Sequence, residues 1–206
     1  MKIKLEDLSK RYLYDWIFKS INHTFENNSS TAIIGNNGSG KSTILKIILG
    51  IEQPSKGAVS YFLKDSIINS EDSSKNIDFI APYQNLIEEF STQEMIEFHF
   101  KFKKKNNILS VSQLLEETGL KKETKKNISN FSSGMKQRLK LILAFCSDSP
   151  LLLLDEPTVN LDQQGIEWYR DTIKQLIGKK TIIISSNQLN EYDFCQDLLD
   201  ILLYKK

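Results

Sequence analysis

The sequence predicts an α/β fold built on a mainly parallel β-sheet. Short apolar runs recur along the chain without polar alternation, as expected for strands that are covered on both faces. These runs are TAIIG (31–35), IDFIA (77–81), LLLLD (151–155) and TIIIS (181–185). Helical patterns lie between them, at KSTILKIIL (41–49), MKQRLKLILAFC (135–146) and GIEWYRDTIKQLIG (165–178). Strands that alternate with helices favour a parallel sheet with helices on its faces.

The two ends of the chain depart from this pattern. The start, KIKLEDLSKRY (2–12), alternates more and predicts an antiparallel β edge. The last expected strand is ILLY (201–204). We therefore expect a single domain over residues 1–206.

Residues 85–131 lack a buried strand and predict a helical subdomain inserted between core segments 1–84 and 132–206. Eight lysines fall between Lys101 and Lys126, against three acids. Two interpretations stay open. The lysines form a solvated helical face, or they lie near anionic lipid headgroups or an acidic loop of a membrane partner.

The composition excludes several classes of protein. A net charge of +1 provides no strong footprint for nucleic acid. The two cysteines, Cys146 and Cys195, do not make a disulfide framework, so a reduced compartment is expected. The N-terminus has no secretory pattern, and no stretch approaches the roughly 20 apolar residues that cross a bilayer. Any membrane-spanning part is therefore expected on another chain.

A phosphate loop follows the first apolar strand. GNNGSGKST (35–43) fits G-x-x-x-x-G-K-[ST] and opens a helical pattern, which is the context this motif requires. Backbone N–H groups of such a loop bind phosphate oxygens, while Lys41 reaches the β and γ phosphates and Ser42 can ligate Mg²⁺. The fold class is therefore a P-loop NTPase. The predicted nucleotide-binding residues of the loop are Gly35, Asn36, Asn37, Gly38, Ser39, Gly40, Lys41, Ser42 and Thr43.

Two acids end the fully apolar strand LLLLD. Charged groups beside a buried strand are costly unless they have partners. In a P-loop enzyme an acid at this point holds Mg²⁺, which suits Asp155. Glu156 is then the candidate general base for the attacking water. An ordinary strand-end turn before Pro157 is the alternative.

The segment from Asn127 to Asp162 resembles the signature-to-Walker-B region of ABC-type ATPases. FSSGM (131–135) occupies the place of the family's LSGGQ, at the matching distance from the acid pair. The resemblance extends from about Lys2 to Leu203. It implies an ATP-hydrolysing fold that uses ATP and Mg²⁺.

The resemblance also implies roles for single residues. Ser132, Ser133 and Gly134 would cap the γ-phosphate of ATP bound to a second subunit, and Ser132 also fits a plain helix N-cap. Asp162 falls in the D-loop, which crosses the dimer interface. Tyr12 stands where the family has an aromatic that stacks on adenine, with Tyr14 and Trp16 as nearby competitors.

Several positions depart from the family's pattern. Asn187 stands where the family has a switch histidine. An asparagine amide donates a hydrogen bond to phosphate but carries no proton charge. Ser133 replaces a glycine and Met135 a glutamine. Gln84 fits the Q-loop, as a ligand of the metal and the attacking water, only if the loop is one or two residues shorter.

The family's mechanism implies a dimer that buries two ATP molecules head to tail, as a homodimer or a heterodimer. It also implies a separate transmembrane subunit, with this chain in the cytoplasm on the inner face of the membrane. No nucleic-acid partner is expected. We therefore expect the ATP-hydrolysing subunit of an ABC transporter. The alternatives are a soluble ABC ATPase acting on ribosomes or DNA, and a weakly hydrolytic regulatory subunit.

Overall fold

The computed structural model describes residues 1–64, 66–69 and 73–205. These residues group into two units. The sheet unit comprises Met1–Phe79, Pro150–Asp155 and Ile177–Lys206, and the helical unit comprises Ile80–Ser149 and Glu156–Leu176. Each unit is described in turn.

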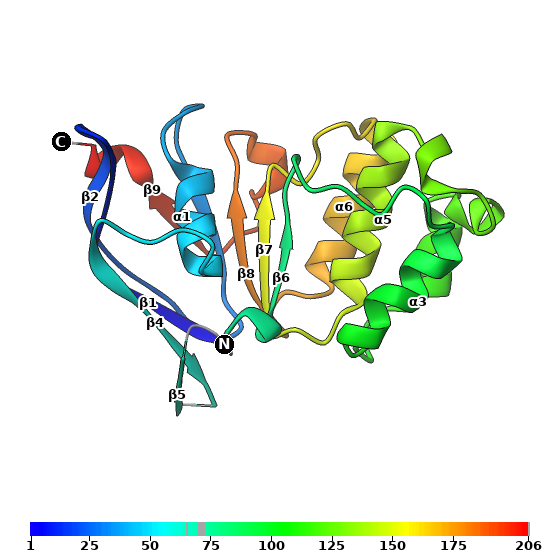
Figure 1. Cartoon of the computed structure of the whole chain (residues 1–206), viewed down its shortest axis with the longest axis horizontal. Coiled ribbons are helices and arrows are strands. Elements are labelled where there is room, and N and C mark those ends of the chain that lie inside the picture. Colours follow the sequence, from blue (N-terminus) through cyan, green and yellow to red (C-terminus); the bar gives the residue numbers. More distant parts are fainter. Residues whose placement is uncertain (65, 70–72, 206) are drawn as a thin grey trace. The chain divides into compact units, whose positions relative to one another are not determined.

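A parallel sheet carries the predicted apolar strands. Among the described residues its strand order is β6-β7-β8-β3-β9. The strands are β3 (Ser30–Ile34), β6 (Ile77–Ile80), β7 (Leu151–Asp155), β8 (Thr181–Ser185) and β9 (Asp197–Asp200). β8 pairs in parallel with β7 and with β3, and β3 pairs in parallel with β9. The arrows of β6, β7 and β8 point the same way in Figure 1. All four predicted strands are confirmed, to within one residue at each end.

An antiparallel sheet forms the N-terminal edge, as predicted. It consists of β1 (Lys2–Tyr12), β2 (Asp15–Phe25), β4 (Lys56–Leu63) and β5 (Ser66–Ile68), in the order β2-β1-β4-β5. β2, β4 and β5 were not predicted from the sequence. In β2 the buried Phe18, Ile21 and Phe25 are separated by more exposed residues. Its apolar signal is therefore weaker than that of a strand covered on both faces.

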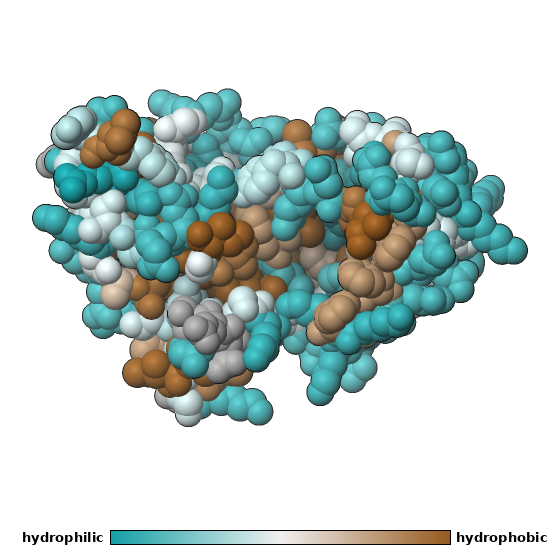
Figure 2. Space-filling view, in the orientation of Figure 1, coloured by the Kyte–Doolittle hydropathy of each residue, from teal (hydrophilic) through white to brown (hydrophobic). Residues whose placement is uncertain are grey.

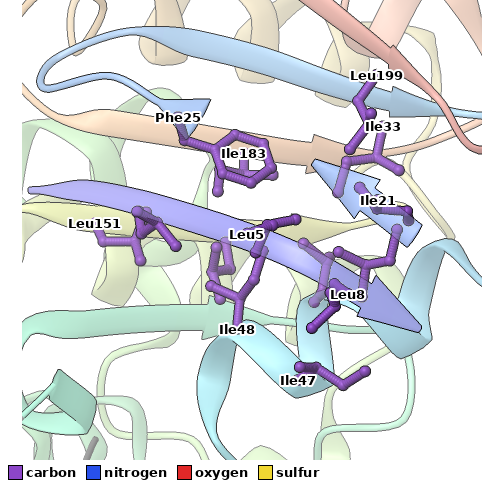
Figure 3. Packing of buried hydrophobic residues seen from close by; sticks show 14 of the residues in the cluster. Leu5, Leu8, Ile21, Phe25, Ile33, Ile47, Ile48, Leu151, Ile183 and Leu199 are labelled. Atoms are coloured by element: carbon purple, nitrogen blue, oxygen red, sulfur yellow. The ribbon is translucent and has the colours of Figure 1, made fainter. Parts of the chain in front are cut away.

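The hydrophobic core of the sheet unit joins both sheets to α1 (Lys41–Leu49). Figure 3 shows Leu5 and Leu8 of β1 beside Ile47 and Ile48 of α1. Phe25, Ile33, Leu151, Ile183 and Leu199 complete the cluster from β2, β3, β7, β8 and β9. Each such side chain stabilises the fold by about 1.5–3 kcal/mol on burial. This packing fixes the start of α1 against the end of β3, where the phosphate loop lies.

Four helices form the helical unit: α3 (Thr92–Phe102), α4 (Val111–Glu117), α5 (Ser133–Cys146) and α6 (Gln163–Lys174). α3 begins with a capping box, in which the Ser91 N–H donates to Glu94 Oε2 at 2.8 Å and the Glu94 N–H donates to Ser91 Oγ. The helices expected within the insertion are therefore present. The bounds of that insertion, 85–131, stay a prediction.

Two predicted elements need correction. ILLY (201–204) is a 3₁₀ helix and not a strand, and β9 ends just before it. Asp200 Oδ1 accepts a hydrogen bond from the Leu202 N–H at 2.9 Å, which closes a turn instead of extending the ladder. The helix expected over 165–178 runs from Gln163 to Lys174.

None of the helices formed by the described residues combines the length and the apolar character that a membrane span requires.

Candidate functional site

The phosphate loop connects the end of β3 to the start of α1 in the sheet unit. Gly35 and Gly40 have φ angles of 148° and 103°. A Cβ at Gly35 would lie 2.6 Å from Ile201 Cγ2, and one at Gly40 would lie 2.4 Å from Ile17 Cγ2. Only glycine therefore fits at these two positions, both for backbone conformation and for space. The N-terminus of α1 follows the loop directly, and a helix N-terminus favours an anion.

Lys41, the first residue of α1, is nearly buried, with 5% of its surface exposed. Its ammonium donates to the Gly35 carbonyl at 2.8 Å and to the Asn36 carbonyl at 3.2 Å. The side chain thus folds back over the loop that would hold phosphate. A phosphate group in the loop would offer this ammonium stronger, charged acceptors than two neutral carbonyls.

Asp155 ends β7 at the carboxyl edge of the parallel sheet, where ligands bind in open α/β sheets. The residue is 2% exposed, and its Oδ1 accepts a hydrogen bond from Ser185 Oγ at 2.8 Å. Asp155 and Ser42 both offer hard oxygen ligands, which suit Mg²⁺. The donor set in the sheet unit therefore fits a magnesium ion that phosphate oxygens help to coordinate.

Asn187 lies just after β8 and reaches the phosphate loop. Its Nδ2 donates a hydrogen bond to Asn37 Oδ1 at 2.8 Å. Both predicted site residues are thereby brought together in the sheet unit. An amide at this position is free of titration near neutral pH, unlike histidine.

Tyr12 ends β1, and 46% of its surface is exposed. Its hydroxyl donates to Glu52 Oε1 at 2.5 Å. Burial and the interaction with Glu52 raise the pKa of Tyr12, and the Thr43 side chain acts in the opposite direction. Burial works against ionisation of Glu52, but hydrogen bonds from Tyr12 and Lys10 outweigh it and lower the pKa of Glu52. Tyr14, one of the two other aromatic residues considered beside Tyr12, lies at the tip of the β1–β2 hairpin and is 93% exposed.

The signature residues begin α5 in the helical unit. Ser132 is the N-cap, with its Oγ accepting from the Met135 N–H at 3.2 Å. A Cβ at Gly134 would lie 2.8 Å from the Asn160 carbonyl oxygen. The signature and the D-loop are therefore in close backbone contact, and glycine at position 134 permits it.

The D-loop itself leads into α6. Asp162 is the N-cap of α6, accepting from the Gly165 N–H at 2.9 Å, and it pairs with Arg138 at 2.5 Å. The hydrogen bond from Gly165 is the main cause of the lowered pKa of Asp162, and Arg138 adds to it. Asn160 and Glu156 both have a positive φ, of 65° and 45°. Non-glycine residues in this region each store about 1–3 kcal/mol of strain.

Gln84 lies in the loop after β6, also in the helical unit. Its Oε1 accepts from the Ala81 N–H at 3.0 Å, so the side chain folds back on its own loop. The buried Lys140 of α5 donates to the Ala81 and Gln84 carbonyls at 3.2 and 3.3 Å. Desolvation lowers the pKa of Lys140. The loop that carries Gln84 is therefore held by α5.

Four residues that contact the predicted site residues through their side chains were not predicted from the sequence: Ser185, Glu52, Arg138 and Lys140. Ser185 ends an apolar strand next to the strand of Asp155, which was an available signal. Glu52 and Lys140 contact residues that lie 40 and 56 positions away, and no local pattern indicates such contacts.

Comparisons with known proteins agree on one family. The family model described as ABC transporter matches residues 18–159. The bacitracin transport ATP-binding protein BcrA of Bacillus licheniformis is 32% identical over 97% of this chain and 66% of its own length. The lantibiotic transport ATP-binding protein SrtF of Streptococcus pyogenes is 31% identical over 97% of this chain and 86% of its own.

A solved structure supports the same fold. It is the dimeric structure of an ATP-binding cassette in a post-hydrolysis state bound to ADP and phosphate. It matches with a TM-score of 0.80 and 23% identity, over 96% of this chain and 93% of that one. This likeness confirms the predicted P-loop α/β architecture.

Proposed function

Since this chain belongs to the ABC transporter family and is an ABC-type ATPase, we propose that it drives transport through a separate membrane subunit by ATP-dependent dimerisation. The observation that carries the proposal is the phosphate loop, with Lys41 folded over it and Asn187 bonded to it. Such a loop is built to hold the phosphates of a nucleotide.

The nucleotide is held by the sheet unit in this proposal. The loop N–H groups and Lys41 bind the phosphates, and Tyr12 stacks on adenine. Ser42 and Asp155 would hold Mg²⁺, with Gln84 as a further ligand, and the bound ion would supply positive charge that neutralises the phosphates. Ser185 orients the Asp155 carboxylate through their 2.8 Å hydrogen bond.

Hydrolysis requires a base and a γ-phosphate contact. Glu156 accepts the proton of the attacking water. Asn187 donates a hydrogen bond to the γ-phosphate, for which it exchanges its bond to Asn37. Gln84 orients the water after it releases the Ala81 N–H.

In this proposal the signature completes the nucleotide site of a second ATPase subunit; a solved cassette of the same fold is dimeric. Ser132 and the free N–H groups of Ser133 and Gly134 lie at the start of α5, a helix N-terminus that favours an anion. Asp162 lies at the same dimer interface. Sedimentation of a Glu156→Gln variant with ATP and Mg²⁺ tests this step. A dimer is expected with ATP, and a monomer with ADP.

The membrane subunit is proposed to contact α3 of the helical unit. Figure 2 shows hydrophobic surface along α3. Phe98 and Phe102 of this helix are 37% and 76% exposed, and their rings stack edge to face at 5.2 Å. Exposed aromatic clusters of this kind mark interaction sites. The protein would then lie on the cytoplasmic face of the membrane.

The names of two relatives support a proposal for the cargo of transport. BcrA and SrtF are named for bacitracin and lantibiotic transport. We propose an exporter that removes peptide antibiotics of this class. Deletion of the gene for this chain is expected to make the source cells more sensitive to such peptides. Unchanged sensitivity would argue against this cargo.

The experiment that tests the transporter function is a mild-detergent pull-down of the tagged protein from its own cells. Mass spectrometry is expected to identify a polytopic membrane protein in comparable amount. Recovery of ribosomal or other soluble proteins alone would favour a soluble ABC ATPase instead. A weakly hydrolytic regulatory subunit is the other alternative, because Asn187 replaces the switch histidine.

A further inference from the structure

Lys10, Tyr12 and Glu52 form a closed triangle of contacts in the sheet unit. The Tyr12 hydroxyl donates to Glu52 Oε1 at 2.5 Å, and Lys10 Nζ lies 2.9 Å from the same oxygen. Lys10 Nζ also lies 4.9 Å from the centroid of the Tyr12 ring. Each member therefore contacts both of the others.

This cluster is shielded more than an ordinary surface ion pair. The side chains of Lys10 and Glu52 are only 12% and 20% exposed, whereas Lys4 and Glu6 of the same sheet are 47% and 49% exposed. Lys10 Nζ additionally donates to the Gln53 carbonyl at 2.7 Å. Screening by water is weaker in such a place, so the geometry is better defined than that of a typical exposed pair.

The backbone on the Glu52 side is fixed as well. The N–H groups of Ile51 and Glu52 donate to the Lys46 carbonyl at 3.0 and 3.2 Å, which ties this segment to the end of α1. The same helix begins with Lys41 at the phosphate loop. Tyr12 is thus connected through Glu52 to the helix that carries the phosphate-binding residues.

The Tyr12 ring keeps exposed surface in this arrangement. Lys10 lies over the ring, while 46% of the Tyr12 surface is exposed. A partly exposed aromatic residue with a cation over its ring is suited to stack on a planar partner. Holding the ring in advance removes part of the entropy cost of ordering it when the partner binds.

We propose that Glu52 and Lys10 are positioning residues that hold the Tyr12 ring ready to stack on the purine base of ATP. This inference rests on the proposed function, since it takes the base to lie on Tyr12. It assigns part of the affinity for the base to an ion pair outside the phosphate loop. Its effect therefore appears in nucleotide affinity and not in the chemical step.

The test compares Glu52→Ala, Glu52→Gln, Tyr12→Phe and Tyr12→Ala in steady-state ATP hydrolysis and in binding of a fluorescent ATP analogue. Glu52→Ala is expected to raise the KM for ATP by about 3- to 10-fold with kcat within about twofold, because preorganisation is lost but not the reacting groups. Tyr12→Phe keeps the ring but loses the hydroxyl, so the same rise is expected. The double variant should be no worse than either single variant.

Two further measurements exclude a merely structural effect. Glu52→Gln keeps an acceptor for the Tyr12 hydroxyl and is expected to restore part of the affinity. Inhibition by tripolyphosphate, which has no base, should be unchanged in all of these variants. Glu6→Ala is the matched control, because it removes an exposed ion pair of the same sheet, in which Lys4 Nζ lies 2.8 Å from Glu6 Oε1. The KM for ATP is expected to be unchanged in this variant.

The outcomes separate this inference from the proposed function. A wild-type protein that neither binds nor hydrolyses ATP overturns both. Weak ATP binding by Tyr12→Ala with normal binding by Glu52→Ala overturns the positioning role alone. Equal losses of ATP and tripolyphosphate affinity in Glu52→Ala also overturn it, because the defect would then lie in the phosphate loop.

Discussion

Asn187 Nδ2 donates a hydrogen bond to Oδ1 of Asn37, across 2.8 Å and 150 positions of sequence. A residue at the end of β8 is thereby tied to the phosphate loop after β3, through strands that pair in parallel. Because both groups are neutral amides, this contact does not depend on pH near neutrality. It holds the Asn187 side chain at the phosphate loop, where we propose that it meets the γ-phosphate.

Replacing Asn187 tests that role in ATP turnover. Asn187→Ala is expected to lower kcat by about 100- to 1,000-fold, since the loss of one hydrogen-bond donor to developing charge costs roughly this order. Asn187→His restores a hydrogen-bond donor at this position. It also adds an imidazole, so turnover of this variant should gain a pH dependence around the ordinary histidine pKa of about 6.5. Near wild-type turnover in Asn187→Ala would rule out the proposed role.

Ser185 is predicted to support Asp155. Ser185→Ala leaves the buried carboxylate without its hydroxyl donor, so the free energy of unfolding should fall by about 1–3 kcal/mol. The Mg²⁺ concentration for half-maximal ATP hydrolysis should rise as well. Urea titration and a Mg²⁺ titration measure the two effects. Ser185→Thr is the control, because threonine keeps the hydroxyl group. If Ser185→Ala behaves like Ser185→Thr in both titrations, the prediction is wrong.

Gly134 is predicted to tolerate no side chain. A Cβ there would approach the Asn160 carbonyl oxygen to 2.8 Å, so Gly134→Ala must displace the D-loop or the start of α5. Such overpacking costs about 1–3 kcal/mol. Thermal unfolding should show the loss, and ATP hydrolysis should fall at least 10-fold. Ser133→Ala, at the exposed neighbouring position, should leave unfolding nearly unchanged. Equal behaviour of the two variants would contradict the contact.

Lys140 gives a prediction about pH. Desolvation lowers its pKa in the folded state below the ordinary value of 10.5, so the unfolded chain binds more protons between these two values. Stability should therefore rise with pH through that alkaline window. Lys140→Met should flatten the rise, as measured by urea unfolding at several pH values. The same slope in both proteins would show that Lys140 is not the group responsible.

The sequence predicted best those elements whose signal is local. LLLLD and TIIIS are buried on both faces, so an unbroken apolar run was enough to predict each strand. The glycines of the phosphate loop predicted the turn between β3 and α1. β2 was not predicted because exposed and half-buried polar residues separate its buried ones, so the sequence shows no continuous apolar run there. ILLY was misread because an apolar run does not distinguish a strand from a turn capped by Asp200.

The site followed the same division. Motif residues such as Lys41 and Asp155 stand in recognisable local contexts. The partners that hold them do not, because the Tyr12–Glu52 and Ser185–Asp155 contacts depend on which strands and helices meet in the fold. Asn187 was located by its resemblance to a family position, and its bond to Asn37 became visible only in three dimensions.

The most direct test of the account is the steady-state release of phosphate from ATP by the purified protein with Mg²⁺. Wild-type protein should hydrolyse ATP, whereas Glu156→Gln should bind ATP but lose at least about 100-fold in kcat, as expected for removal of a general base. Lys41→Ala should lose nucleotide binding. Equal turnover by the wild type and Glu156→Gln would contradict the assignment of Glu156 and the hydrolytic site built around it.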